Sequence, residues 1–171
     1  MDGIISSRAI RAETLDRHIC SAAYAAIFLL GALLFWLSAR HPSLLPVWAP
    51  WDFSTPEYLA TSLTLFWFAR GFALATPETR LPAWRCVFFL AGLGTIYAVL
   101  QTRIEYLSQH MFYINRLQHV AMHHIGPFLI AIGCAGQTIK TGMPTWARNV
   151  VESRFVTDCV RRLQQPILAV F

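Results

Sequence analysis

Four apolar stretches, separated by polar or proline-rich segments, set the organisation of this 171-residue chain. Each is close to the ~20 residues that an α-helix needs to cross about 30 Å of hydrocarbon. The pattern therefore predicts an all-α fold, a polytopic transmembrane helix bundle of about four spans. We place the spans at 19–38, 58–75, 84–100 and 119–135.

The segments around these spans complete the predicted organisation. Residues 1–18 are polar and precede a transmembrane domain at 19–135, in which Gly92 and Gly94 are expected to allow close helix contact. Residues 104–118 carry charges and predict an interfacial helix or a water-lined outer turn. Residues 136–171 predict a loop, an amphipathic surface helix at 150–165 and a short apolar end. We expect this end to begin a further span of a longer protein, the alternative being a short anchor packed on the other helices.

Composition supports the membrane assignment and excludes several functions. The chain is 56% apolar and only 13% charged, whereas soluble domains are about 25% charged. Its net charge of +5 comes mostly from arginines between the apolar stretches, which favours topology signals over nucleic-acid binding. The four cysteines form no C-x-x-C pair, and no hydrolase, nucleotide-binding or zincin motif is present, so we do not expect an enzyme.

The distribution of basic residues predicts the orientation of the chain. Cytoplasmic segments carry the excess of Lys and Arg. Arg40 and Arg103 follow the first and third spans, whereas ten basic residues flank the other span ends. This places the N-terminus in the cytoplasm and the start of the fourth span at the outer face, which is the periplasmic face of a bacterial inner membrane. The ten are Arg8, Arg11, Arg17, Arg80, Arg85, Lys140, Arg148, Arg154, Arg161 and Arg162.

That outer end carries the candidate chemistry. Residues 110–124 hold four of the six histidines and two of the four methionines. His119 and His123 are four residues apart and share a helix face, and Met122 flanks it. Imidazole and thioether together suit copper, in particular Cu(I). The candidate metal ligands are His119, His123, His110, His124 and Met122.

Other roles for these histidines stay open at the level of sequence. No single helix completes a four-ligand site, so further ligands would come from another span, a passing partner or a second copy in a homo-oligomer. Haem is the alternative cofactor, in a small b-type cytochrome or quinone-interacting redox subunit whose helices hold the group between them. A scaffold subunit is the third reading, with histidines bonded to backbone or to Glu105, Gln109 and Gln118.

The stretch from Leu117 to Gly133 resembles the signature of the CtaG-like family of multispanning cytochrome c oxidase assembly proteins. Gln118, His119, Pro127, Leu129 and Gly133 match that signature, and His110-Met111 is similar to an upstream His-Met pair of the family, at a longer spacing.

The resemblance implies an inner-membrane factor for the biogenesis of haem–copper oxidases, acting in copper delivery or insertion. Its partners would be the lipid bilayer and an oxidase subunit or periplasmic copper chaperone. The chain departs from the family in two respects: Asn115 stands where another histidine is common, and the later spans of a roughly seven-span protein are absent from this sequence.

Overall fold

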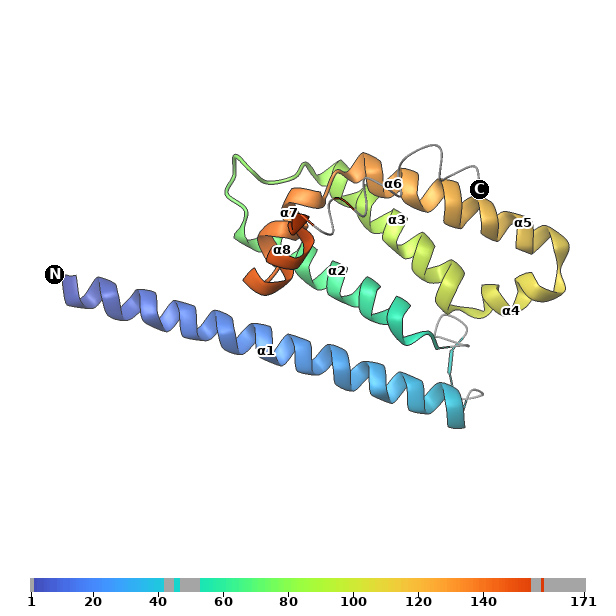
Figure 1. Ribbon diagram of the computed structural model, residues 1–171, viewed down its shortest axis with the longest axis horizontal. Coiled ribbons are helices and arrows are strands. Elements are labelled where there is room, and N and C mark those ends of the chain that lie inside the picture. Colours follow the sequence, from blue (N-terminus) through green and yellow to red (C-terminus); the bar gives the residue numbers. More distant parts are fainter. Residues whose placement is uncertain (1, 42–44, 47–52, 155–157, 159–171) are drawn as a thin grey trace.

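The computed structural model describes residues 2–41, 45–46, 53–154 and 158, with side chains from residue 18 onward, and most of these residues are helical. No strand occurs among these residues, which confirms the predicted all-α class. Figure 1 shows the helices. They are α1 (Asp2–Arg40), α2 (Thr55–Leu74), α3 (Ala83–Gln101), α4 (Arg103–His110), α5 (Phe112–Val120), η2 (Ala121–Ile125), α6 (Gly126–Gly133), α7 (Gly136–Gly142) and α8 (Thr145–Val151).

Local sequence explains where the main helices begin and end. Ser54 is the N-cap of α2, and Pro56 lies in its first turn, where a missing N–H costs no hydrogen bond. Pro82 is the N-cap of α3. The side chain of Thr102 accepts a hydrogen bond from the Ile104 N–H and so caps α4. The chain is extended at Met111, and this break separates α4 from α5.

The number of membrane spans differs from the prediction. Two described helices are long and apolar enough to cross a membrane, His18–Arg40 within α1 and Ala83–Gln101. The continuous helix Phe112–Gly133 and α7 add a third if this pair, bent by 72°, is one span. The predicted count of four is not confirmed, because α2, which carries Glu57 and Arg70, is not among these helices. The predicted surface helix at 150–165 and the apolar end at 166–171 lie largely outside the described residues.

Helices α3 and α6 pack closely because small residues line their contact. A Cβ on Gly92 would lie 2.8 Å from the Gly126 carbonyl oxygen, and one on Gly133 would lie 2.7 Å from Cβ of Phe89. Phe89 is buried with Phe68, and their ring centroids are 4.5 Å apart. The close contact predicted for Gly92 is therefore confirmed. The one predicted for Gly94 is wrong, since nothing lies within 4 Å of a Cβ there.

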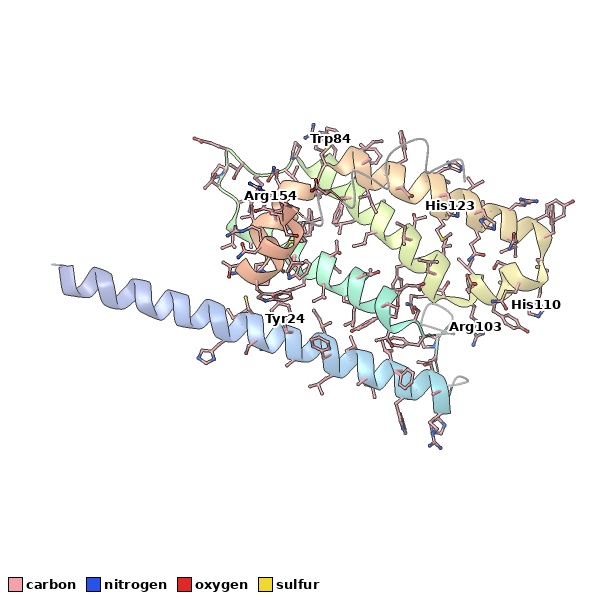
Figure 2. All side chains as sticks on the ribbon, in the orientation of Figure 1. Tyr24, Trp84, Arg103, His110, His123 and Arg154 are labelled. Carbon is pink, nitrogen blue, oxygen red and sulfur yellow. The ribbon has the colours of Figure 1, made fainter. Side chains whose placement is uncertain are left out.

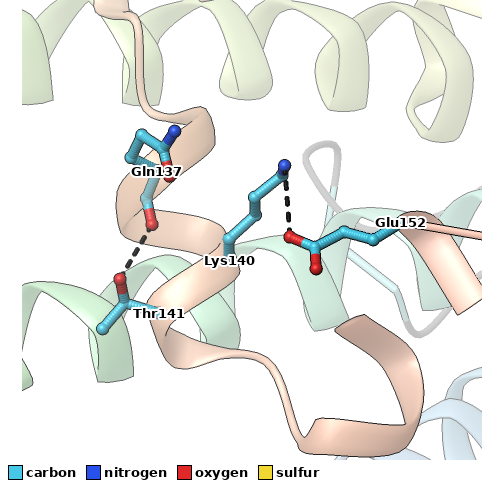
Figure 3. Close-up of polar contacts among 4 residues, drawn as sticks. All are labelled: Gln137, Lys140, Thr141 and Glu152. Atoms are coloured by element: carbon cyan, nitrogen blue, oxygen red, sulfur yellow. Dashed lines mark hydrogen bonds and ion pairs between the residues drawn. The ribbon is translucent and has the colours of Figure 1, made fainter. Parts of the chain in front are cut away.

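A second backbone contact joins α2 to α7. A Cβ on Gly71 would lie 1.8 Å from the Thr138 carbonyl oxygen, and one on Gly142 would lie 1.8 Å from the Trp67 carbonyl oxygen. Arg70 Nη1 donates to the Gly142 carbonyl oxygen at 2.9 Å. A positively charged side chain therefore provides a hydrogen-bond partner for a carbonyl group at the C-terminal end of α7. Beyond α7 the chain turns into α8, and Lys140 pairs with Glu152 at 3.4 Å (Figure 3).

Helix α1 runs along one side of the bundle and is held by a few contacts with α2 (Figure 1). The Tyr58 hydroxyl donates to the Ile27 carbonyl oxygen at 3.0 Å, and Trp67 Nε1 donates to the Tyr24 hydroxyl at 3.0 Å. Gly31 is the single buried residue among the described side-chain positions of α1, and it lies against the Tyr58 ring. Most of the described side chains of α1 are accordingly exposed or only partly buried.

Replacing Tyr58 with Phe should weaken the attachment of α1. The ring is kept, but the Ile27 carbonyl loses a partly buried donor, so we expect the free energy of unfolding to fall by about 1 kcal/mol. Unfolding in mixed detergent, followed by circular dichroism, measures this change. The matched control is Tyr113→Phe, because Tyr113 is 86% exposed. Equal stabilities of the two variants would contradict the assigned role of the hydroxyl.

Candidate functional site

The candidate residues lie on a helix whose winding changes along its length. The run from Phe112 to Gly133 is α-helical at both ends and π-helical between Ala121 and Ile125. There the Gly126 N–H bonds to the Ala121 carbonyl oxygen, five residues back. Pro127 accounts for this winding, because its ring would clash with the His123 carbonyl in a regular α-helix and it supplies no N–H. Single π-helical turns occur frequently at functional sites.

Two of the predicted ligands lie side by side on this helix. The rings of His119 and His123 have centroids 5.7 Å apart and are parallel to within 10°. Both residues are exposed, so their rings have space to turn toward a shared ion. The shared face expected from their spacing is therefore present, and their role as metal ligands stays a prediction.

The remaining predicted ligands do not gather around this pair. His124 is exposed, and with His123, Ile125, Pro127 and Phe128 it lines an open hollow of about 440 Å³. Met122 is half-buried. Within the described residues, no group of three or more His, Cys, Asp or Glu side chains is placed to hold a metal ion. The pair would need ligands from elsewhere to complete a site.

His110 lies at the end of α4, away from His123 on the returning helix (Figure 2). The chain bends at Met111, which separates His110 from the helix that carries His119. His110 is instead held on its own helix: its Nδ1 lies 2.9 Å from the Tyr106 carbonyl oxygen, and its ring packs on the Tyr106 ring at 4.5 Å. This backbone bond is the kind expected of a structural histidine.

Polar side chains tie α4 to α5 beside the histidine pair. Gln118 Nε2 donates to the Glu105 carboxylate, and Gln109 Nε2 also donates to Glu105, at 3.5 Å. These three residues were expected as possible partners of the histidines, and in the described structure they bond to one another instead. Gln118 precedes His119, so this contact fixes the backbone immediately before the pair.

A polar cluster that the sequence did not predict lies where α2, α3 and α4 meet. Gln101 is only 1% exposed and bonds to the carbonyl of Ser54 and to Glu57, residues far from it in sequence. The available signal was a glutamine at the end of an apolar span. An uncharged polar residue at the end of a span normally marks the boundary of the membrane. The sequence therefore did not distinguish the buried Gln101 from a solvent-exposed glutamine.

The geometry defines a helical membrane protein with an exposed imidazole pair beside a proline-induced π turn. The model of the cytochrome c oxidase caa3 assembly factor family (Caa3_CtaG) matches residues 64–171, which is well over half of the chain, and the chain belongs to this family. The matched part contains the whole helix from Phe112 to Gly133 and leaves α1 outside. No curated protein and no solved structure matches the chain. Family membership supports a role in cytochrome c oxidase assembly and, together with the membrane-spanning helices, indicates a membrane protein.

Proposed function

We propose that this protein handles copper during cytochrome c oxidase assembly, through His119 and His123 at the periplasmic face of a bacterial inner membrane. The observation that carries the proposal is the pair of parallel, exposed imidazoles 5.7 Å apart within the part matched by the family. The orientation rests on the excess of basic residues in the N-terminal segment and in the loops on its side. The protein acts as an assembly factor and not as an enzyme.

The donor set suits a soft transition metal. Imidazole nitrogens and thioether sulfurs favour copper over the hard cations magnesium and calcium. Met122, adjacent to His123, supplies a thioether in the same segment. The pair at His119 and His123 leaves coordination positions open, so a ligand from the donor or acceptor protein can bind the same ion. An incomplete site of this kind is suited to transfer, because a closed site would retain the ion.

The proposed partners follow from this chemistry. A periplasmic copper chaperone would supply the ion, and an oxidase subunit would receive it. The open hollow beside His123, with Pro127 and Phe128 on its wall, offers an apolar surface next to the pair against which such a partner can pack.

Metal analysis of the detergent-purified protein tests the proposal. Protein expressed with copper should contain copper, and the variant His119→Ala/His123→Ala should lose it. The matched control is His18→Ala/His41→Ala, which removes two exposed histidines outside the cluster. Equal copper content in all three proteins would refute the assigned site. An absorbance scan of the same samples tests the alternative, because a Soret band lost in the first variant would favour a b-type cytochrome.

A further inference from the structure

An apolar groove runs between α2 and α3, apart from the histidine pair. Two adjoining cavities of about 330 and 570 Å³ form it, and both have Leu65 and Leu90 in their walls. The smaller cavity lies toward the loop that joins the two helices, whereas the larger one also has Leu30 and Leu34 of α1 in its wall. Leucine and aromatic side chains form most of the lining, and none of the lining residues is charged.

The groove has the length of one leaflet of a bilayer. On α3 its lining extends from Cys86 to Tyr97, which corresponds to about 16 Å of rise along an α-helix. The hydrocarbon of a bilayer is about 30 Å thick, and each leaflet supplies about half of it. Helix α3 is one of the described helices that are long and apolar enough to cross a membrane. Because hydrocarbon contains no water, a groove along such a helix is filled by an apolar group.

Gly94 keeps part of this groove open. The residue lines the larger cavity, and nothing lies within 4 Å of a Cβ built on it. Gly92, on the same helix, instead lies against the backbone of α6. The two glycines therefore have different roles: Gly92 allows close contact between helices, and Gly94 leaves space for another molecule.

Two arginines lie where the groove approaches the loop between α2 and α3. The Arg80 guanidinium carbon is 4.7 Å from the centroid of the Phe72 ring, which lines the smaller cavity. Arg85 directly precedes Cys86, another lining residue, and its Nε is buried without a hydrogen-bond partner. Neither guanidinium forms an ion pair with a carboxylate of the described residues. Trp84, exposed at the start of α3 (Figure 2), is typical of the headgroup level of a membrane.

From this arrangement we infer that the groove binds an anionic phospholipid, with its phosphate beside Arg80 and Arg85 and one acyl chain between α2 and α3. Charge complementarity selects this occupant. An apolar helix of another protein would fill the groove but leave two cations unpaired, whereas a phospholipid carries a negative charge at one end of an apolar chain. In the predicted orientation this end is cytoplasmic, the side on which basic sites between membrane helices bind anionic headgroups. The inference does not depend on the proposed copper function.

Native mass spectrometry of the full-length, detergent-purified protein tests the inference. Phosphatidylglycerol and phosphatidylcholine with the same acyl chains are added separately. We expect phosphatidylglycerol to bind at least about fivefold more tightly, because each arginine near the headgroup favours the anionic lipid. This preference should disappear in Arg80→Gln/Arg85→Gln. The matched control Arg40→Gln/Arg116→Gln removes two exposed arginines that lie outside the groove, and it should keep the preference.

Further measurements test the acyl chain separately from the headgroup. Gly94→Leu places a side chain in the groove and should lose most of the bound phosphatidylglycerol, while His119→Ala/His123→Ala should retain it. In the parent protein, the unfolding temperature should rise with phosphatidylglycerol, because a lipid bound only by the folded state stabilises it. It should stay unchanged with sn-glycerol 3-phosphate, which lacks the chain.

Four results would each overturn the inference. They are equal binding of the two lipids by the parent, a loss of equal size in the arginine control, unchanged binding in Gly94→Leu, and an equal rise with sn-glycerol 3-phosphate. Lipid-free dimers in place of lipid adducts would likewise contradict it, because a second copy of the chain would then cover the groove.

Discussion

Cells that depend on this protein should lose most of their active cytochrome c oxidase when His119 and His123 are both replaced with Ala. The two rings are exposed and parallel, so their removal deletes the proposed donors without disturbing a packed core. Loss of supporting groups around a metal costs about 10–100-fold in affinity or activity, and loss of two direct ligands should cost at least as much. Oxidase activity in isolated membranes and the haem spectrum of the assembled enzyme measure the effect.

Copper supplementation makes this experiment specific. If the pair acts in copper delivery, excess copper in the medium should restore part of the oxidase activity, because direct loading bypasses the lost site. The variant His18→Ala/His41→Ala should assemble oxidase normally. A loss that copper leaves unchanged, with normal amounts of the variant in the membrane, would indicate a scaffold role for the histidines.

The second large effect is expected from Gly71→Ala. The new Cβ would lie 1.8 Å from the Thr138 carbonyl oxygen and 3.0 Å from the Gly142 nitrogen, both backbone atoms that cannot rotate away. Helices α2 and α7 would have to separate, and Arg70 would lose its position beside the Gly142 carbonyl. Overpacking in a tight interior costs about 1–3 kcal/mol, and this contact lies at the upper end or beyond. The unfolding midpoint in mixed detergent and the amount of protein recovered from membranes report the loss.

Two glycines provide the controls for this variant. A Cβ at Gly94 or at Gly136 would meet nothing within 4 Å. Gly94→Ala lies in the interior of α3, where alanine is the better helix former, so it should leave stability unchanged or raise it slightly. Destabilisation of equal size in Gly94→Ala and Gly71→Ala would mean that the contact between α2 and α7 does not set the stability of the fold.

The helical class was predictable because long apolar stretches bounded by proline and charge have few alternatives in a membrane. The way the helices pack was less predictable. Helix α2 has the length of a membrane span. However, Glu57 at one end accepts a hydrogen bond from Gln101, and Arg70 near the other end caps α7. The bend after Gly133 depends on Cys134, which adopts a left-handed conformation with φ of 47°. Cysteine rarely does so, and its sequence position carries no signal for such a bend.

The residues of the candidate site likewise divide into contacts that the sequence predicts and contacts that only the folded structure reveals. The contact between His119 and His123 follows from spacing along one helix, so the sequence predicted it. The position of His110 depends on how α4 and α5 separate at Met111 and on packing against Tyr106, which spacing does not specify. Glu57 and Glu105 line one pocket although they belong to helices far apart in the chain, so tertiary packing alone brings them together.

The π-helical turn has a consequence for how this helix can vary. Relative to a regular α-helix it accommodates one additional residue, and one residue corresponds to a rotation of about 100° around the axis. Compared with the same sequence wound as a regular α-helix, the π turn therefore rotates the part of the helix before it by about this angle relative to the part after it. The part before it presents His119, while the part after it keeps Gly126 and Gly133 against α3. A one-residue deletion between Ala121 and Ile125 would let the helix return to regular α winding, and it would keep both the direction of the His119 imidazole and the glycine contacts with α3. The π turn, together with the glycine contacts, thus sets the direction in which the imidazole of His119 points relative to α3.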